Sequence, residues 1–152
     1  QATVNPTLRP EADALGLRAA LKRGAFDFMA TDHAPHAEVD KPDDLRRAAF
    51  GMTGLEVAIP QMARLVEQGA LDWPAVVDWF THSPARTLHL EGGALQVGAV
   101  ADITVVDPAR VWTIDAATLR SRSKNSPLLG LTLRGRAVLT LVEGEARHNE
   151  LP

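Results

Sequence analysis

The chain has 152 residues, of which 45% are hydrophobic and 23% charged, and this composition is typical of a globular protein with a packed core. Sixteen Lys and Arg residues against 19 Asp and Glu residues give a net charge of -3, which argues against nucleic-acid binding, since phosphate contacts need clustered positive charge. The sequence has no cysteine and no long apolar run, so it excludes disulfides, thiolate metal sites and a membrane-spanning helix.

The first predicted element is a helix over residues 10–23. Its last turn carries Lys22 and Arg23, and Gly24 follows, as is typical of a helix C-terminus. The next segment, residues 25–31, is short and largely apolar. We expect it to form a strand buried on both faces and to end at Asp32.

A loop rich in Pro, His and charged residues then extends from Asp32 to about Gly51. Compact domains rarely contain so long a loop without a function for it. The pattern Thr53-x-x-Glu56 predicts a capping box at the start of a second helix, which closes at Gly69. We expect Pro60 to kink this helix.

Two further helices are predicted before residue 90. One begins with Asp72 as its cap and continues through Phe80. The other is short and starts with Ser83 as its cap and Pro84 as its first residue.

The hydrophobic period changes after residue 93. Alternating or β-branched runs over 100–106, 111–114, 131–133 and 137–142 predict strands, and Glu143-Gly144 predicts a hairpin turn into a last strand over 145–148. Residues 1–90 carry 9 basic and 12 acidic side chains, and residues 91–152 carry 7 of each. We therefore expect two domains, over 1–90 and 91–152.

The densest group of chemically capable side chains is Thr-Asp-His-Ala-Pro-His at residues 31–36. It follows the predicted buried strand, and α/β barrels build their active sites at the carboxyl ends of strands. A carboxylate and two imidazoles there suit metal binding or proton transfer. Alternatively, Asp32 only caps the strand end and the histidines lie in solvent. One short loop cannot complete a zinc site, which needs three or four ligands.

Three other segments are candidates. Asn5 precedes a proline and can hold a carboxylate or amide, although an ordinary turn is the favoured interpretation. At Phe50-Gly51 the glycine allows close backbone approach to a ligand, but a glycine before a helix is common. Residues 124–127, Lys-Asn-Ser-Pro, can reach an active site, although a solvated turn is favoured.

Three motifs together resemble the carboxyl-terminal portion of class I dihydroorotases of the amidohydrolase superfamily. They are residues 31–36, Asn-Pro-Thr-Leu-Arg at 5–9, and Phe-Gly-Met-Thr-Gly-Leu-Glu at 50–56. The stretch Gly98-x-x-Ala101-Asp102 is similar to the point where amidohydrolases leave their barrel for a β-sandwich. The resemblance covers essentially the whole chain. It implies an α/β fold, namely the last part of a TIM-type (β/α)8 metallo-dependent hydrolase barrel followed by the C-terminal strands of a small β-sandwich domain.

The resemblance also implies roles for individual residues. Asp32 matches a metal ligand that is also the general acid/base. Asn5 and His36 match residues that bind the substrate, His36 through the substrate carboxylate. Phe50 and Gly51 match a pair whose backbone contacts the pyrimidine ring. His33 matches no ligand.

The sequence departs from the family pattern at three positions. Thr7 stands where Pro is commoner, Val39 replaces part of an acidic run, and Ala49 stands where Pro usually precedes the Phe-Gly pair. None of these departures removes a reacting group.

The activity that the resemblance implies is the reversible, zinc-dependent cyclisation of N-carbamoyl-L-aspartate to L-dihydroorotate in de novo pyrimidine biosynthesis. One or two zinc ions would polarise a carbonyl and supply a hydroxide near neutral pH. Asp32 would carry the proton from the attacking hydroxide to the leaving nitrogen.

A complete barrel needs roughly 250 residues, more than this chain has. We therefore expect a fragment of a longer enzyme, beginning at Gln1, with the remaining metal ligands upstream and no activity of its own. The lack of a long apolar run and of a signal-peptide pattern at the N-terminus leads us to expect a cytoplasmic protein. The resemblance further implies a homodimer that acts on a small molecule, with association with aspartate carbamoyltransferase left open.

Two alternatives remain. The parent protein could be a hydantoinase-like or allantoinase-like cyclic amidase, although those enzymes usually depart from the motif after the first Asp-His. It could also be a non-catalytic dihydroorotase-like subunit that supports aspartate carbamoyltransferase. Such subunits usually lose their metal ligands, so the presence of Asp32, His36 and Asn5 counts against this alternative.

Overall fold

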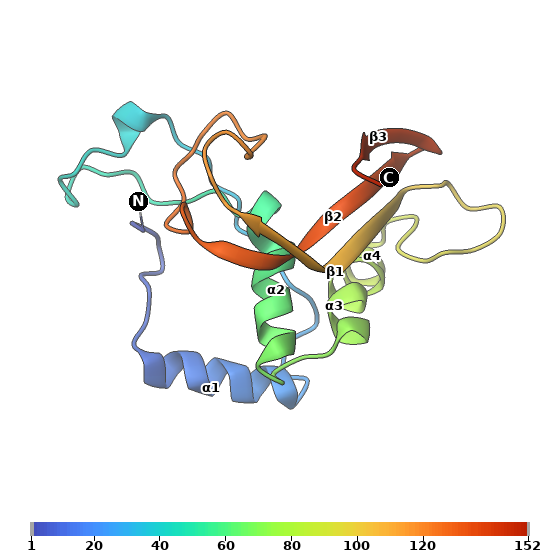
Figure 1. Cartoon of the computed structure of the whole chain (residues 1–152). Coiled ribbons are helices and arrows are strands. Elements are labelled where there is room, and N and C mark those ends of the chain that lie inside the picture. Colours follow the sequence, from blue (N-terminus) through green and yellow to red (C-terminus); the bar gives the residue numbers. More distant parts are fainter. Residues whose placement is uncertain (1, 152) are drawn as a thin grey trace.

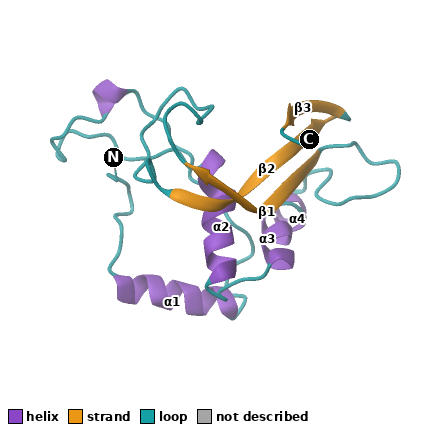
Figure 2. Cartoon of the chain, in the orientation of Figure 1, coloured by secondary structure: helices purple, strands orange, loops and turns teal. Residues whose placement is uncertain are grey.

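The computed structural model describes residues 2–151, and Gln1 and Pro152, the outer limits of the two predicted domains, lie outside it. The described elements are α1 (Glu11–Lys22), η1 (Glu38–Asp40), η2 (Leu55–Val57), α2 (Ala58–Glu67), α3 (Trp73–Phe80), α4 (His82–Leu88), β1 (Ile103–Thr113), β2 (Thr132–Val142) and β3 (Glu145–Asn149). The strands form one antiparallel sheet in the order β1-β2-β3. Figure 1 shows α2 beneath the crossing strands β1 and β2, and Figure 2 shows long loops gathered at one end of the molecule.

The helix predicted over residues 10–23 is confirmed as α1. Glu11 and Asp13 lie in its first turn and Lys22 in its last, which suits the helix dipole. Gly24, with a φ of 68°, follows the helix end. None of the residues of α1 is buried. In Figure 1 the helix lies at the bottom, well away from the sheet.

The buried strand predicted over residues 25–31 is wrong. The segment has no strand assignment, and its side chains are exposed or half-buried. Nearby backbone pairing is limited to an isolated parallel bridge between His33 and Met52. A strand inside a closed parallel barrel pairs its N–H and C=O groups with a neighbour on each side. Residues 2–151 supply no such neighbours for this segment.

The capping box predicted at Thr53 and Glu56 is also wrong. The Thr53 side chain is 6% exposed, and its hydroxyl has no hydrogen-bond partner within the described part of the chain. The Glu56 carboxylate instead accepts the backbone N–H groups of Arg120 and Ser121, at 2.6 and 2.7 Å. The Glu56 side chain therefore binds residues that are distant in sequence instead of capping its own helix.

The second helix begins as a 3-10 turn, η2, and continues as α2. Pro60 is the third residue of α2, where the backbone N–H has no partner within the helix, so the proline costs no hydrogen bond. The irregularity therefore lies at the junction of η2 and α2 rather than at a kink in the middle of the helix.

The third helix is confirmed as α3, with the Asp72 carboxylate accepting the N–H of Ala75 at 2.9 Å. The cap predicted for the fourth helix is wrong, because α4 starts at His82 and Thr81 occupies the cap position. Ser83 lies within α4, and its hydroxyl donates to the Asp78 carboxylate at 2.5 Å. A capping rule based on the local sequence does not predict this contact with Asp78 of α3.

The four strand runs predicted between residues 100 and 142 are present as two long strands. β1 contains the first run from Ile103 onward and the second run up to Thr113. An irregularity between Asp107 and Val111 interrupts its pairing with β2. β2 joins the last two runs. The predicted turn at Glu143-Gly144 is confirmed by positive φ angles of 53° and 82° at these residues. The predicted last strand is confirmed as β3.

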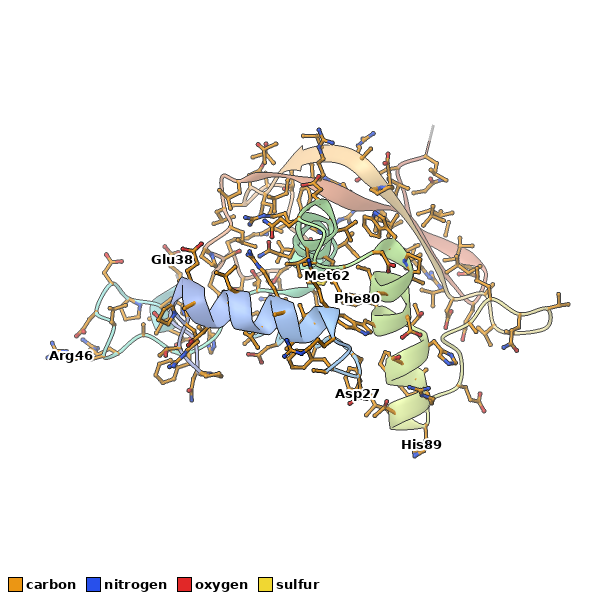
Figure 3. The ribbon with its side chains drawn as sticks, turned by 90° about the horizontal axis from the view of Figure 1, so that it is seen from below. Asp27, Glu38, Arg46, Met62, Phe80 and His89 are labelled. Carbon is orange, nitrogen blue, oxygen red and sulfur yellow. The ribbon has the colours of Figure 1, made fainter. Side chains whose placement is uncertain are left out.

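The sheet packs directly on α2. At Gly135 of β2, an added Cβ would lie 3.0 Å from the Cβ of Ala63 in α2, so the glycine permits this close contact. Val57, Ile114 and Leu119 form a small buried core beside it. Figure 3 shows Met62 and Phe80 on the neighbouring helices α2 and α3. The division into domains 1–90 and 91–152 stays a prediction.

Within residues 2–151, no helix combines the length and the apolar character needed to cross a membrane.

Candidate functional site

Two loops that are far apart in the sequence lie side by side at one end of the molecule (Figures 1 and 2). The first covers residues 32–54 and carries most of the predicted site residues. The second connects β1 to β2 over residues 114–131. The N-terminal segment packs against the first of these loops, since the Gly51 N–H donates to the Thr3 carbonyl at 2.9 Å. The structure thus assembles the candidate site from three parts of the chain.

The His36 ring contacts the backbone of the Phe50-Gly51 pair through the Phe50 carbonyl. Its Nε2 atom lies 2.8 Å from the Phe50 carbonyl oxygen. Since a carbonyl only accepts, Nε2 carries a proton, and Nδ1 is a second donor when the ring is protonated on both nitrogens. The structure therefore brings together three residues that were singled out from the sequence.

Gly51 is required at its position for two reasons. Its φ of 136° lies in a region that other residues rarely adopt. An added Cβ would also lie 2.5 Å from the Cβ of Ala34 and 2.9 Å from His36 Nε2. Side chains of any size would therefore push the His36 ring away from the backbone of residues 50–51.

Lys41 is a buried cation that holds this backbone. Its side chain donates to the carbonyl oxygens of Thr3, Ala49 and Gly51 at 3.1, 2.8 and 2.9 Å. These three bonds use all the donors of an ammonium group, which is how a buried charge without a carboxylate partner is compensated. Sequence analysis did not single out Lys41, because a lysine in a charged loop carries no local signal of burial.

Asn125 is the second buried residue of the site that the sequence pattern did not predict. Residues 124–127 were expected to form a solvated turn, but Asn125 is only 4% exposed. Its Oδ1 accepts the backbone N–H of His36 at 3.2 Å, and its Nδ2 donates to the carbonyls of Ala34 and Gly51 at 3.3 and 3.1 Å. A solvated turn is therefore the wrong interpretation for this residue.

Asp32 is exposed, and its φ is 45°. Few residue types other than glycine adopt this conformation, and aspartate is one of them. The next residue, His33, is fixed because its Nδ1 accepts the N–H groups of Gly54 and Leu55 at 3.0 and 3.2 Å. His33 therefore caps the start of η2, a local role that the sequence motif did not reveal.

Asn5 is exposed and follows the anchored Thr3 by two residues. The peptide bond between Asn5 and Pro6 is cis. The contacts of Thr3 with Gly51 and Lys41 tie the segment that bears Asn5 to the same loop as His36. No direct contact between Asn5 and the other predicted site residues is present in the described structure.

A cavity of about 790 Å³ lies between the two loops, lined by residues 35–38, Lys41, residues 121–125 and Leu129. His36 lines it, but Asp32, Asn5, Phe50 and Gly51 do not. Two of its cations are engaged with the backbone, since Lys124 donates to the carbonyls of Leu119 and Ser121 at 2.6 Å each, as Lys41 does to its three. Most of the residues singled out by the sequence motifs therefore lie outside this cavity.

The described residues do not complete a metal site. Within residues 2–151, no group of three or more His, Cys, Asp and Glu side chains could hold a metal ion. A zinc ion takes four ligands in structural sites and three protein ligands in catalytic ones. Asp32 can supply one ligand, so a metal would need further ligands from outside the described residues.

The family profile described as "Amidohydrolase family" matches residues 3–147. Proteins named dihydroorotase from Geobacter sp. (strain M21) and Citrifermentans bemidjiense are 46% and 45% identical to the chain over 144 residues, which is 95% of the chain and 34% of either protein. The chain thus spans about a third of the length of these curated relatives. The resemblance to dihydroorotases is confirmed.

Among solved structures, the L-hydantoinase (dihydropyrimidinase) from Arthrobacter aurescens superposes with a TM-score of 0.88 at 31% sequence identity. The match covers 99% of the chain and 35% of the hydantoinase. This likeness confirms the predicted fold class, the last part of a TIM-type (β/α)8 barrel followed by a small antiparallel sheet.

Proposed function

The chain belongs to the amidohydrolase family, and we propose that it is part of a dihydroorotase, a hydrolase that reversibly closes N-carbamoyl-L-aspartate to L-dihydroorotate in pyrimidine biosynthesis. The observation that carries the proposal is the contact of His36 with the Phe50-Gly51 backbone. It joins two of the three motifs on which the resemblance to dihydroorotases rests, in a chain 46% identical to a protein of that name.

In this proposal each site residue performs one task. His36 and Asn5 bind the free carboxylate of the substrate. The backbone of Phe50 and Gly51 lies against the pyrimidine ring, which requires the close approach that a glycine permits. Asp32 accepts a proton as the ring carbonyl is attacked and delivers it to the nitrogen that leaves. The exposure of Asp32 in the described chain is compatible with access for the substrate.

The proposal includes zinc, as one or two ions, which supplies Lewis-acid polarisation of the carbonyl when bound. Asp32 is the ligand that this chain would contribute. The described residues do not hold the metal by themselves, so the proposal requires ligands from a longer protein. Residues 1–90 would then complete a barrel and residues 91–152 a β-sandwich.

The wider context is part of the same proposal. The parent enzyme would act in the cytoplasm on a small molecule, as a homodimer, with association with aspartate carbamoyltransferase as a further arrangement. The net charge of -3 supports the absence of a nucleic-acid partner.

The test uses the longer protein that contains this chain, purified with zinc. We expect it to interconvert dihydroorotate and carbamoyl aspartate, and we expect Asp32→Asn to abolish the activity. Asp27→Asn is the matched control, since Asp27 is exposed and lies outside the three motifs. Robust dihydroorotase activity of the 152-residue chain alone would contradict the expectation that it is an incomplete enzyme.

One specific observation favours a second candidate. The structural match at 31% identity is to a protein named as a hydantoinase and dihydropyrimidinase. Parallel assays with dihydroorotate, hydantoin and dihydrouracil separate the two activities, because a hydantoinase would prefer the rings without a carboxylate. Failure with all three rings would favour a non-catalytic subunit, and binding to aspartate carbamoyltransferase would then be measured directly.

A further inference from the structure

Asn125 connects the β-rich part of the chain to the candidate site. Three hydrogen bonds of its amide are made with the backbone of the loop that carries His36. The acceptor takes the His36 N–H, and the two donors go to the carbonyls of Ala34 and Gly51. The backbone carbonyl of Asn125 also accepts the N–H of Thr53 at 3.0 Å. One residue thus holds both sides of the loop.

The orientation of this amide is fixed by its partners. If oxygen and nitrogen were exchanged, the oxygen would face the two carbonyls of Ala34 and Gly51, and the nitrogen would face the His36 N–H. Three donor and acceptor matches would become three clashes of like groups. The Ser123 hydroxyl, which lies against both the Asn125 Oδ1 and the His36 carbonyl, makes the same segment more rigid.

The Asn125 and Lys41 side chains donate to the same carbonyl oxygen. The Gly51 carbonyl receives both the Asn125 amide and the Lys41 ammonium group, at 3.1 and 2.9 Å. Its direction is therefore determined by two buried donors that arrive from different segments. The adjacent Phe50 carbonyl, to which the His36 ring is bonded, is fixed as a consequence.

The loop that bears Asn125 is itself held in place. The Glu56 carboxylate binds the N–H groups of Arg120 and Ser121. Lys124 donates to the Leu119 and Ser121 carbonyls. The Glu56 contacts attach the loop to the start of the second helix, and the Lys124 contacts brace the loop internally. Asn125 therefore contacts the His36 loop from a well-anchored segment.

We propose that Asn125 is a positioning residue for the substrate-binding side of the site, acting through the His36 backbone and the Gly51 carbonyl. This inference rests on the proposed function for its catalytic consequence, but the contact itself is independent of it. Asn125 reaches no reacting atom. Its loss would therefore weaken substrate binding through His36 and Phe50-Gly51 and leave proton transfer by Asp32 largely intact.

The experiment compares Asn125→Asp and Asn125→Ala in the full-length protein with the control Ser126→Ala. Ser126 is the next residue and is 1% exposed, and among the described residues its hydroxyl accepts the Leu128 N–H alone. Asn125→Asp retains the side-chain shape and the acceptor for His36 but loses both donors. We expect KM for dihydroorotate to rise about 10-fold or more in both Asn125 variants, with kcat changed less than about 3-fold. Ser126→Ala should leave KM unchanged.

Hydrogen–deuterium exchange gives a readout that does not depend on turnover. In Asn125→Ala the His36 N–H loses its acceptor, so its exchange should become at least about 10-fold faster. In Asn125→Asp the acceptor remains, so the His36 amide should exchange as in the wild type while KM still rises.

An unchanged KM in Asn125→Asp, with a loss of stability no larger than that of Ser126→Ala, would overturn the positioning role. Unchanged exchange of the His36 amide in Asn125→Ala would overturn the contact. If the wild type does not turn over dihydroorotate, the proposed function fails by itself, and the exchange measurement still decides whether Asn125 holds the loop. If Asn125→Ala does not fold, the kinetics of Asn125→Asp provide the test.

Discussion

The ammonium group of Lys41 lies 2.9 Å from the carbonyl oxygen of Gly51, in a side chain that is 9% exposed. This contact is one of three that Lys41 makes with carbonyl oxygens from two different segments of the chain. Within residues 2–151, backbone carbonyls alone compensate this positive charge, in place of the salt bridge that a buried lysine usually has.

We expect Lys41→Met to destabilise the protein by about 1 to 3 kcal/mol, because it removes three charge-assisted hydrogen bonds, although the carbonyls of Thr3 and Gly51 keep a second donor each. Urea unfolding measures the change. The matched control is Lys22→Met, since Lys22 is exposed in the last turn of α1, where a cation contributes only about 0.3 to 1 kcal/mol. Equal losses in the two variants would show that the carbonyl contacts of Lys41 have no special weight.

We expect His33→Ala to cost about 0.5 to 2 kcal/mol, because the N–H groups of Gly54 and Leu55 lose their common acceptor. His33→Asn should restore most of the stability, since its side-chain oxygen can occupy the place of Nδ1. The measurement is thermal or urea unfolding of the three proteins.

His82→Ala serves as the control for His33, because His82 is an exposed histidine at the first position of α4. Its loss should change the free energy of unfolding by less than about 0.5 kcal/mol. If His33→Asn is no more stable than His33→Ala, the capping role of His33 is incorrect.

Gly51→Ala should be strongly disruptive, for the new methyl group would lie within 3 Å of both the Ala34 Cβ and the His36 ring. Backbone strain at a φ of 136° adds to this. We expect a loss of several kcal/mol in stability, or of substrate binding if the loop moves instead. Unfolding and dihydroorotate binding are measured on the same samples.

The comparison variant for Gly51 is Gly16→Ala. Gly16 lies in the interior of α1, and an added Cβ there meets nothing within 4 Å. Alanine is the better helix former by about 0.5 to 1 kcal/mol, so this variant should be more stable than the wild type. The same substitution thus has opposite expected signs at the two glycines.

Glu56→Gln should weaken the attachment of the loop over residues 114–131. One carboxylate oxygen becomes an amide NH2 group, a donor that faces the N–H of Arg120 or Ser121, and the charge is lost. Because Glu56 is half-buried, we expect about 1 to 2 kcal/mol, below the upper range for charge-assisted bonds. Glu67→Gln is the control, because the exposed Glu67 makes only a 3.9 Å ion pair with Arg134. Exchange of the amides of Arg120 and Ser121 should rise only in the Glu56 variant.

Local sequence rules predicted the elements that are stabilised locally. Asp72 accepts from the residue three positions along, as its cap pattern indicates, and Glu143-Gly144 adopts the positive φ angles of a tight hairpin. The Lys22-Arg23-Gly24 pattern located the end of α1 within one residue. In these cases the determining contacts lie within a few positions of the sequence signal.

The remaining features depend on partners that are distant in sequence. Thr53 and Glu56 match the capping-box pattern, yet the Glu56 carboxylate binds the N–H groups of residues 120 and 121. The N–H groups at the start of η2 are instead accepted by the His33 side chain. Residues 25–31 have the composition of a buried strand but lack neighbours to pair with. For the site, the sequence motifs indicated His36, Phe50 and Gly51, whereas Asn125 and Lys41 contain no local signal of their contacts.

The separation between Asn125 and its partners has a consequence for the order of folding. Its side-chain contacts with Ala34, His36 and Gly51 close loops of 91, 89 and 74 residues. The entropy of closing such loops must be offset before the contacts stabilise anything, whereas the β2-β3 hairpin forms between adjacent segments. The loop carrying His36 should therefore become ordered after the folding transition state. Substitutions at Asn125 should then accelerate unfolding and leave the folding rate nearly unchanged.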